Sequence, residues 1–196
     1  MNLVDRAKNI MLTPKTEWPV IAAEAPNPTA IMTGYVLPLA LIPAVATVIG
    51  TGLIGGIMGT SLTWGIGMGV VSFISTVLGV YLTALVMNFL APNFGSQKDF
   101  GRAMQTVAYS YTPAWVAGIL NIIPAIGWLG ALLGLYGLYL MYLGLPHTMK
   151  TPQDKVILYL IVTIIVLVIV FAILGAILGG IMAAMLGFGM MGVMGS

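Results

Sequence analysis

Cysteine is absent from this chain of 196 residues, and charged residues make up only 6% of it. The lack of cysteine excludes disulfides, thiol catalysis, cysteine-based zinc sites and iron–sulfur clusters. A soluble domain carries about 25% charged residues, so this chain has too few to cover a globular surface against water. Because 60% of its residues are hydrophobic, the composition indicates an integral membrane protein.

Ionisable side chains are also absent from the middle of each long apolar stretch. Ion-coupled transporters and proton relays usually need such groups at membrane depth. The single histidine, His147, follows Pro146 in a loop and has no cysteine with which to complete a zinc site. No serine or threonine has a histidine or acid partner within the membrane. The sequence therefore predicts a protein that is not an enzyme, with no catalytic residue and no cofactor.

Five apolar segments are each near the length of about 20 residues that a helix needs to cross the hydrocarbon core. They cover residues 31–54, 65–90, 100–123, 128–145 and 156–186. We predict an all-α integral membrane protein with five transmembrane helices, a domain of residues 31–196 that follows a preamble of residues 1–30. The fifth segment is long enough that it must tilt, break near residues 175–180 or extend beyond the membrane.

Turn and cap residues mark the ends of these segments. Pro92 and Gly95 are expected to close the second span, and Pro146 the fourth. Ser96 and Thr151 each stand three residues before an aspartate. This is the spacing of a capping box, with Asp in place of the usual Glu, so both are predicted to begin helices.

The basic residues predict the orientation in the membrane. They precede the first span, or lie between spans two and three or spans four and five: Arg6, Lys8, Lys15, Lys98, Arg102, Lys150 and Lys155. The loops 55–64 and 124–127 and the tail after residue 186 carry none. The positive-inside rule then places the N-terminus in the cytoplasm and the C-terminus on the exterior, periplasmic side of the cytoplasmic (inner) membrane.

The preamble begins with an amphipathic helical pattern. One face carries Leu3, Val4, Ala7, Ile10 and Met11, whereas Asp5, Arg6, Lys8 and Asn9 face elsewhere. Such a helix lies on the membrane surface or packs on its own domain, and the pattern does not choose between them.

A second short helix is expected after Thr13, which resembles an N-cap, with Pro14 at its first position. It would run through Glu17, Trp18 and Ile21, and Pro26 and Pro28 would end the preamble. Trp18 suits the headgroup layer, where indole is half wet and half buried. Pro14, Glu17 and Trp18 are the predicted contacts for the interface or for a cytoplasmic protein partner.

The third segment carries the most polar membrane stretch, residues 108–115. Gln105, Tyr109 and Thr112 share one helical face, and Arg102 continues it toward the cytoplasm. Pro113 removes a backbone donor and frees the carbonyl of Tyr109, and Ser110 and Thr112 can satisfy freed groups locally. The favoured interpretation is a kinked interior helix. The alternative is a polar groove for a lipid headgroup, a solute or a partner segment, formed by Arg102, Gln105, Tyr109, Ser110, Tyr111, Thr112 and Pro113.

Small residues form rows on the last two segments. One row comprises Gly127, Gly130, Gly134 and Gly137, and the other comprises Ala172, Gly175, Ala176, Gly179, Gly180, Ala183, Ala184 and Gly187. Such rows permit close helix approach. We expect them to pack within the chain, against each other, with a dimer as the alternative.

The C-terminal tail is rich in methionine. Thioethers can hold Cu(I), but methionine is also a common, adaptable apolar residue. The sequence therefore predicts no metal site, and copper binding by Met190, Met191 and Met194 is the less favoured alternative.

Several short motifs resemble those of the Yip1 domain family, in particular its short bacterial members. They occur in this order: Leu12-Thr13-Pro14-Lys15-Thr16-Glu17-Trp18, Tyr35 with Pro38, Tyr109-Ser110-Tyr111-Thr112-Pro113, Ile123-Pro124 and Gly144-Leu145-Pro146. The resemblance implies five membrane spans, a cytoplasmic N-terminus and an exterior C-terminus. Eukaryotic members are linked to vesicle trafficking and Rab-type GTPases, but their Asp-Leu-Tyr-Gly-Pro motif is missing here, which weakens the case for a GTPase partner.

These observations predict a non-enzymatic multi-pass membrane protein that organises membrane, acts as an adapter or handles lipid. Its expected partners are the lipid bilayer, a second copy of the chain through the small-residue rows, or a cytoplasmic protein, and no nucleic acid. The alternative is a transporter or channel for a small solute, lipid or metal ion that uses the polar face of the third helix.

Overall fold

The computed structural model describes residues 2–55 and 59–194, and their side chains except those of residue 131 and of residues 178 onward. All regular elements in these ranges are helical, as the composition predicts. The α-helices are α1 Leu3–Leu12, α2 Pro14–Ala23, α3 Pro28–Ile31, α4 Leu37–Ile49, α5 Leu62–Leu90, α6 Phe100–Ser110, α7 Thr112–Ala117, α8 Leu129–Thr148 and α9 Val156–Met194. Short π or 3₁₀ turns join them: η1 Met32–Val36, η2 Gly50–Ile54, η3 Ala91–Phe94, η4 Gly118–Ile122, η5 Pro124–Ile126 and η6 Gln153–Lys155.

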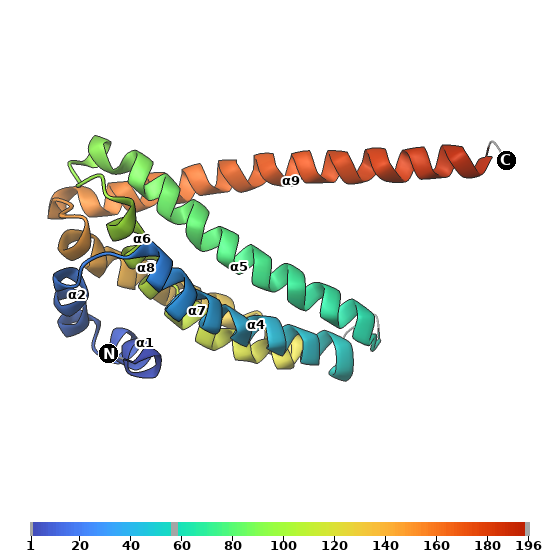
Figure 1. The fold of residues 1–196 in the computed structure, drawn as a ribbon, viewed down its shortest axis with the longest axis horizontal. Coiled ribbons are helices and arrows are strands. Elements are labelled where there is room, and N and C mark those ends of the chain that lie inside the picture. Colours follow the sequence, from blue (N-terminus) through green and yellow to red (C-terminus); the bar gives the residue numbers. More distant parts are fainter. Residues whose placement is uncertain (1, 56–58, 195–196) are drawn as a thin grey trace.

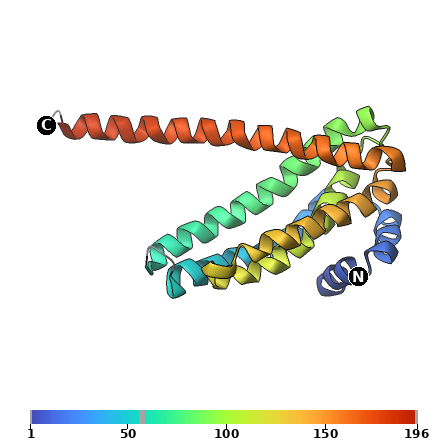
Figure 2. The same cartoon turned by 180° about the vertical axis from the view of Figure 1, so that it is seen from behind.

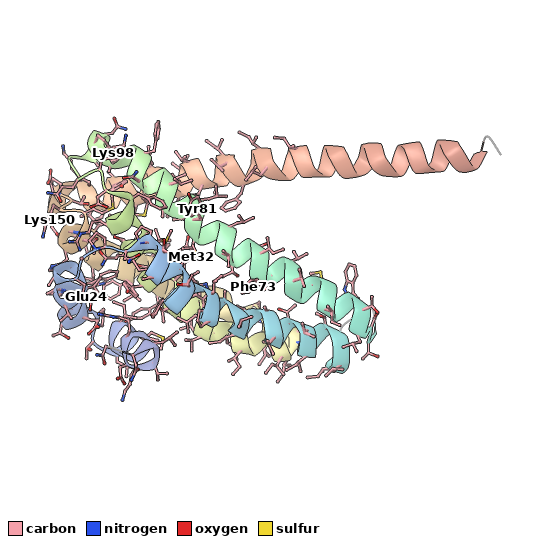
Figure 3. All side chains as sticks on the ribbon, in the orientation of Figure 1. Glu24, Met32, Phe73, Tyr81, Lys98 and Lys150 are labelled. Carbon is pink, nitrogen blue, oxygen red and sulfur yellow. The ribbon has the colours of Figure 1, made fainter. Side chains whose placement is uncertain are left out.

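The long helices form an elongated bundle with the two termini at opposite ends (Figure 1). Helices α4, α7 and α8 lie side by side, and α5 packs along α4. Helix α9 starts beside α5 and then diverges from it, as the view from behind also shows (Figure 2). The preamble helices α1 and α2 cover the end where Glu24, Lys98 and Lys150 are also found (Figure 3). One end of the bundle is therefore rich in charge.

Three helical segments of the described chain are long and apolar enough to cross a membrane. They are Pro28–Ile54, Leu62–Phe94 and Gln153–Ile177, and they correspond to the first, second and fifth predicted spans. The third predicted span is divided at Tyr111 and Gly118 into α6, α7 and η4. The fourth predicted span is α8, a helix of 20 residues. A multi-pass helical membrane protein is thus confirmed, whereas five spans remain a prediction.

The first long segment changes its helical pitch where proline interrupts it. The π turn η1 ends two residues before Pro38, which lacks the N–H that an α-helical turn would use. Tyr35 lies in this turn and is buried. The irregular backbone therefore coincides with a tyrosine that points into the bundle.

Several predicted helix ends need correction. Asp99, and not Ser96, is the N-cap of α6, and its carboxylate accepts a hydrogen bond from the Arg102 amide at 3.1 Å. Ser96 and Thr151 instead hydrogen-bond each other at 2.8 Å and so join two loops. Helix α8 continues through Pro146 to Thr148. The errors at Ser96 and Thr151 arise because local spacing gives no information about the tertiary partner that a hydroxyl will find.

Other boundaries agree with the sequence. Gly95, with φ of 68°, ends the turn that follows α5, and Pro14 begins α2.

Thr13 precedes α2 but its hydroxyl bonds the Asn9 carbonyl instead of capping the helix. Pro28 begins α3 rather than simply ending the preamble. Helix α9 is continuous to Met194, so of the three alternatives for the long fifth segment the break near residues 175–180 does not occur.

The preamble packs on its own bundle, which is one of the two alternatives that its pattern left open. Ala7 and Ile10 are buried as predicted, but Val4 is 68% exposed and Arg6 is buried. The Tyr136 hydroxyl of α8 donates to the Met11 carbonyl at 2.7 Å and fixes the end of α1 on the bundle. Helix α1 therefore packs with most of its predicted apolar face against the protein, but it is rotated so that Arg6 is buried and Val4 is exposed.

The glycine row that leads into α8 packs within the chain, as expected, but on α6 and α7 and not on the small-residue row of α9. A Cβ atom added at Gly137 would lie 2.7 Å from the Ser110 carbonyl oxygen, and one at Gly130 would meet Ala117. This row therefore permits α6 and α7 to approach α8 closely. Ala172, Gly175 and Ala176 of α9 are exposed, and the rest of that row, from Gly179 on, lies outside the described side chains.

Candidate functional site

The predicted polar face lies at the centre of the bundle, where α6 meets α7. Every residue from Ala103 to Ser110 is buried. The helix is interrupted at Tyr111, between α6 and α7, and the Thr112 hydroxyl donates to the Tyr109 carbonyl at 2.8 Å. The prediction that Thr112 satisfies a carbonyl freed by Pro113 is thus confirmed. Ser110 does not do so, since its buried hydroxyl has no hydrogen-bond partner among the described residues.

A tyrosine of the first long segment packs against the break between α6 and α7. The Tyr35 hydroxyl lies 2.7 Å from the Thr112 hydroxyl. Because Thr112 donates its only proton to the Tyr109 carbonyl, Tyr35 must be the donor in this bond. The Tyr35 ring also packs edge-on against the Tyr109 ring, with centroids 4.8 Å apart. These contacts lock the irregular turn η1 onto the irregular α6–α7 junction.

Arg102 and Gln105 bind the end of the preamble helix α2. The Arg102 Nη1 atom donates to the carbonyls of Ala22 and Glu24, both at 2.9 Å, and to Gln105 Oε1 at 3.0 Å. The Gln105 amide donates to the Ile21 carbonyl at 3.4 Å. Helix C-termini leave such carbonyls without intrahelical partners. Two of the predicted groove residues therefore donate hydrogen bonds to the free carbonyl groups at the C-terminal end of α2.

The sequence did not predict the role of Arg6. Its Nη1 atom lies 2.6 Å from Glu17 Oε1, and its Nη2 atom pairs with Glu24. Its guanidinium also lies over the Tyr109 ring, 5.4 Å from the centroid. The Arg6 and Glu17 side chains are each 6% exposed, whereas that of Glu24 is 43% exposed. A buried ion pair thus joins α1 and α2 to the polar face of α6.

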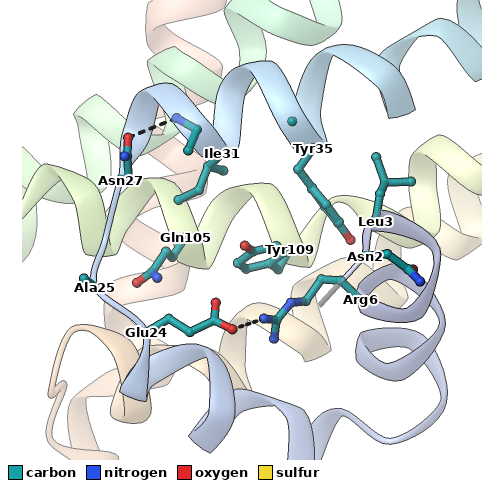
Figure 4. Close-up of a pocket in the computed structure, with 12 residues that line it drawn as sticks. Asn2, Leu3, Arg6, Glu24, Ala25, Asn27, Ile31, Tyr35, Gln105 and Tyr109 are labelled. Atoms are coloured by element: carbon teal, nitrogen blue, oxygen red, sulfur yellow. Dashed lines mark hydrogen bonds and ion pairs between the residues drawn. The ribbon is translucent and has the colours of Figure 1, made fainter.

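A cavity of about 350 Å³ opens beside this ion pair, and we refer to it as the preamble cavity. Figure 4 shows the side chains that line it, which come from α1, the α2–α3 link, the start of the first long segment, and α6. Its polar lining includes Arg6, Glu24, Tyr35, Gln105 and Tyr109. The Tyr109 hydroxyl has no hydrogen-bond partner in the described chain, so it is free to bind a ligand there.

A second cavity of about 460 Å³ lies on the other side of the helix break. Tyr111 and Trp115 line it, together with residues of α4, α5, η4, α8 and α9. The Tyr111 hydroxyl lies 3.0 Å from the Thr83 hydroxyl of α5. The Trp115 ring, which lines the second cavity, has its centroid 6.3 Å from that of Tyr35, which lines the preamble cavity, and 6.2 Å from that of Tyr111.

Of the three residues predicted to face the interface or a partner, two are buried. Trp18 is fully buried, so its predicted place in the headgroup layer is wrong. A Cβ atom added at Gly144 would lie 2.7 Å from the Trp18 ring, which shows how closely α2 and α8 approach. Glu17 is held by Arg6, and only Pro14 is half-buried at the surface.

A metal centre finds no support in the described residues. They contain no group of three or more His, Asp or Glu side chains that is placed to hold a metal ion. Met190, Met191 and Met194, the alternative copper ligands, lie outside the described side chains.

Comparison with known proteins gives one match. The family model of the Yip1 domain matches residues 8–175. This region includes α2, the α6–α7 break and most of the lining of both cavities. Neither the curated proteins nor the solved structures contain a match.

Proposed function

The chain belongs to the Yip1 domain family, and from this premise we propose that it is a non-enzymatic protein of the bacterial cytoplasmic membrane that handles lipid. Its proposed ligand is a zwitterionic lipid headgroup in the preamble cavity. The observation that carries this proposal is the Arg6–Glu24 pair, which is anchored in the protein at Arg6 and open to the cavity at Glu24.

The charges around the preamble cavity favour a zwitterion. Arg6 and Arg102 are balanced by Glu17 and Glu24, so a ligand with net charge would bring an uncompensated charge into a partly dry site. The half-exposed Glu24 carboxylate can accept from an ammonium group. An arginine has five N–H donors, and those that Arg6 does not give to the glutamates can reach a phosphate. The free Tyr109 hydroxyl adds a further donor.

Gly34→Leu is expected to fill the preamble cavity without disturbing the fold. Gly34 lines the cavity, and a Cβ atom added there would meet no neighbouring atom within 4 Å. The protein would be reconstituted in vesicles of equal parts phosphatidylethanolamine and phosphatidylglycerol, and the lipid it retains in mild detergent measured by native mass spectrometry. We expect retained phosphatidylethanolamine to fall about tenfold, which corresponds to ~1.4 kcal/mol.

Gly67→Leu in α5 is the matched control, because that glycine also has open space around it but lines neither cavity. It should retain as much phosphatidylethanolamine as the unmodified protein. Equal retention by the Gly34 and Gly67 variants, or a preference for phosphatidylglycerol, would count against a zwitterion site.

The proposed topology has five spans, a cytoplasmic N-terminus and an exterior C-terminus. Its support is the basic end of the bundle, where α1, α2 and the loops with Lys98 and Lys150 meet. Helix α8 is about 30 Å long at 1.5 Å per residue, the thickness of the hydrocarbon core. The α6–α7–η4 segment runs beside α8 and is proposed as the remaining crossing, the third in sequence order.

Single cysteines can test this topology without background, since the chain has none of its own. In intact cells, a membrane-impermeant maleimide should label Thr60→Cys and leave Lys98→Cys and Lys150→Cys unmodified. All three positions are exposed. The two lysine positions should become labelled only after the inner membrane is permeabilised, and their labelling in intact cells would reverse the orientation.

Transport of a small solute or lipid is the second candidate function. Its support is that Tyr35 and Tyr109 line the preamble cavity, Tyr111 and Trp115 line the second cavity, and the Trp115 ring contacts those of Tyr35 and Tyr111. Movement of one helix at the α6–α7 break would then connect them. An adapter role would have to use Pro14 and the exposed lysines, because Glu17 and Trp18 are buried.

A further inference from the structure

The second cavity lies in the apolar part of the bundle and is distinct from the preamble cavity. It is bounded by Pro43 of α4, by Ser75 and Gly79 of α5, and by Phe171 of α9. Small residues of α7, η4 and the start of α8 leave it hollow: Ala114, Gly118, Gly127 and Gly130. Helix α9 diverges from α5 along its length (Figure 1), and both helices contribute residues to the cavity wall.

The cavity wall contains hydrogen-bonding groups that the protein leaves unused. The Thr83 hydroxyl donates to the Gly79 carbonyl at 2.7 Å, so the Tyr111 hydroxyl must donate to Thr83. The lone pairs of the Tyr111 oxygen are then available to a ligand. Ser75, Thr76 and Asn121 also line the cavity, and their side chains make no hydrogen bond to the described chain. Both donors and acceptors are therefore free.

Among the described residues, the lining contains no charged side chain. A metal ion or a charged headgroup would therefore have no counter-charge in a low-dielectric environment, where isolated charge is costly. Unpaired hydroxyl and amide groups are also costly at membrane depth, since lipid tails offer no hydrogen bonds. The occupant must be uncharged, mostly apolar and able to accept or donate a hydrogen bond.

We propose that the second cavity binds a neutral amphiphile of the membrane, a molecule with an apolar body and an uncharged head of hydroxyl or carbonyl groups. It enters between α5 and α9 and places its polar group between Tyr111 and Asn121. Diacylglycerols and isoprenoid quinones both have this chemistry, and the experiment separates them. This site does not depend on the headgroup proposed for the preamble cavity.

The test uses the full-length protein in phosphatidylglycerol nanodiscs that contain either dioleoylglycerol or a decyl-substituted benzoquinone. Bound probe is measured by native mass spectrometry. Gly79→Leu should lower retention of the bound probe about tenfold, because a Cβ atom there has no neighbour within 4 Å and the longer side chain occupies the cavity. Tyr111→Phe, which removes only the hydroxyl, should lower retention by a smaller factor.

Gly67→Leu on the same helix and Gly34→Leu in the preamble cavity should leave probe retention unchanged. Retention of dioleoylglycerol alone assigns the site to a lipid, and retention of the quinone alone assigns it to a redox carrier. Retention of neither probe, or equal retention by the Gly79 and Gly67 variants, would overturn the proposal. A loss in Gly34→Leu as large as that in Gly79→Leu would overturn the assignment to the second cavity.

Discussion

Replacement of Arg6 by leucine is expected to release the preamble from the bundle. The change leaves the Glu17 carboxylate buried, with a side chain only 6% exposed and no cation beside it. Removal of one partner from a buried ion pair costs about 3–5 kcal/mol, because the remaining charge is desolvated without compensation. The contact of the guanidinium with the Tyr109 ring is lost as well. The amides of α1 and α2 should therefore exchange with deuterium about 100-fold faster or more, at ~1.4 kcal/mol per tenfold change.

The double variant Arg6→Leu/Glu17→Leu should recover most of this protection. Apolar residues of similar size often replace a buried ion pair with little loss, and the half-exposed Glu24 can turn to water. Lys8→Leu changes an exposed cation on the same helix and is the matched control. If Arg6→Leu exchanges no faster than Lys8→Leu, the ion pair does not hold the preamble.

The second large effect is expected at Trp18, which is fully buried between α2 and α8. Trp18→Ala should lower the free energy of unfolding by about 3–5 kcal/mol, the range for removal of a large aromatic side chain from a packed core. Thermal unfolding in detergent measures this loss. Val20→Ala changes a half-exposed side chain of the same helix and should have a much smaller effect.

Gly144 tests the same contact from the other side. Gly144→Ala places a Cβ atom 2.7 Å from the Trp18 ring, so the ring must move, at a cost of about 1–3 kcal/mol. Gly134→Ala on the same helix meets no neighbour within 4 Å and should be neutral or stabilising. Combined with Trp18→Phe, whose ring is smaller, Gly144→Ala should cost less than it does alone. Strict additivity of the two changes would contradict direct packing.

The helical class and the membrane environment could be predicted because both depend on local composition. Apolar length defined the five segments, and Pro113 correctly marked the break between α6 and α7. The assignment of the Tyr109 carbonyl to Thr112 also followed from local geometry, since the two residues are neighbours on one turn. Signals that act within a helical turn are thus readable in one sequence.

The partners of Arg6, Trp18 and Ser96 could not be predicted in this way. Helical periodicity assigned Arg6 to a solvent face, yet the fold brings Glu17 and Glu24 around it. Ser96 has the spacing of a cap, but Thr151 competes for its hydroxyl across the fold. Trp18 is buried because Gly144 lacks a side chain. Each outcome depends on a residue distant in sequence, and local patterns contain no information about it.

The hydrogen bond between Tyr136 and Met11 has a consequence for the two leaflets of the bilayer. Tyr136 lies near the middle of α8, so the end of α1 lies against the side of this helix and not beyond its tip. With the long helices across the bilayer, α1 takes up area in the leaflet on the basic side only. The helices of the opposite half have no such companion in the described chain. In the proposed topology, each copy would therefore take up more area in the cytoplasmic leaflet than in the opposite one.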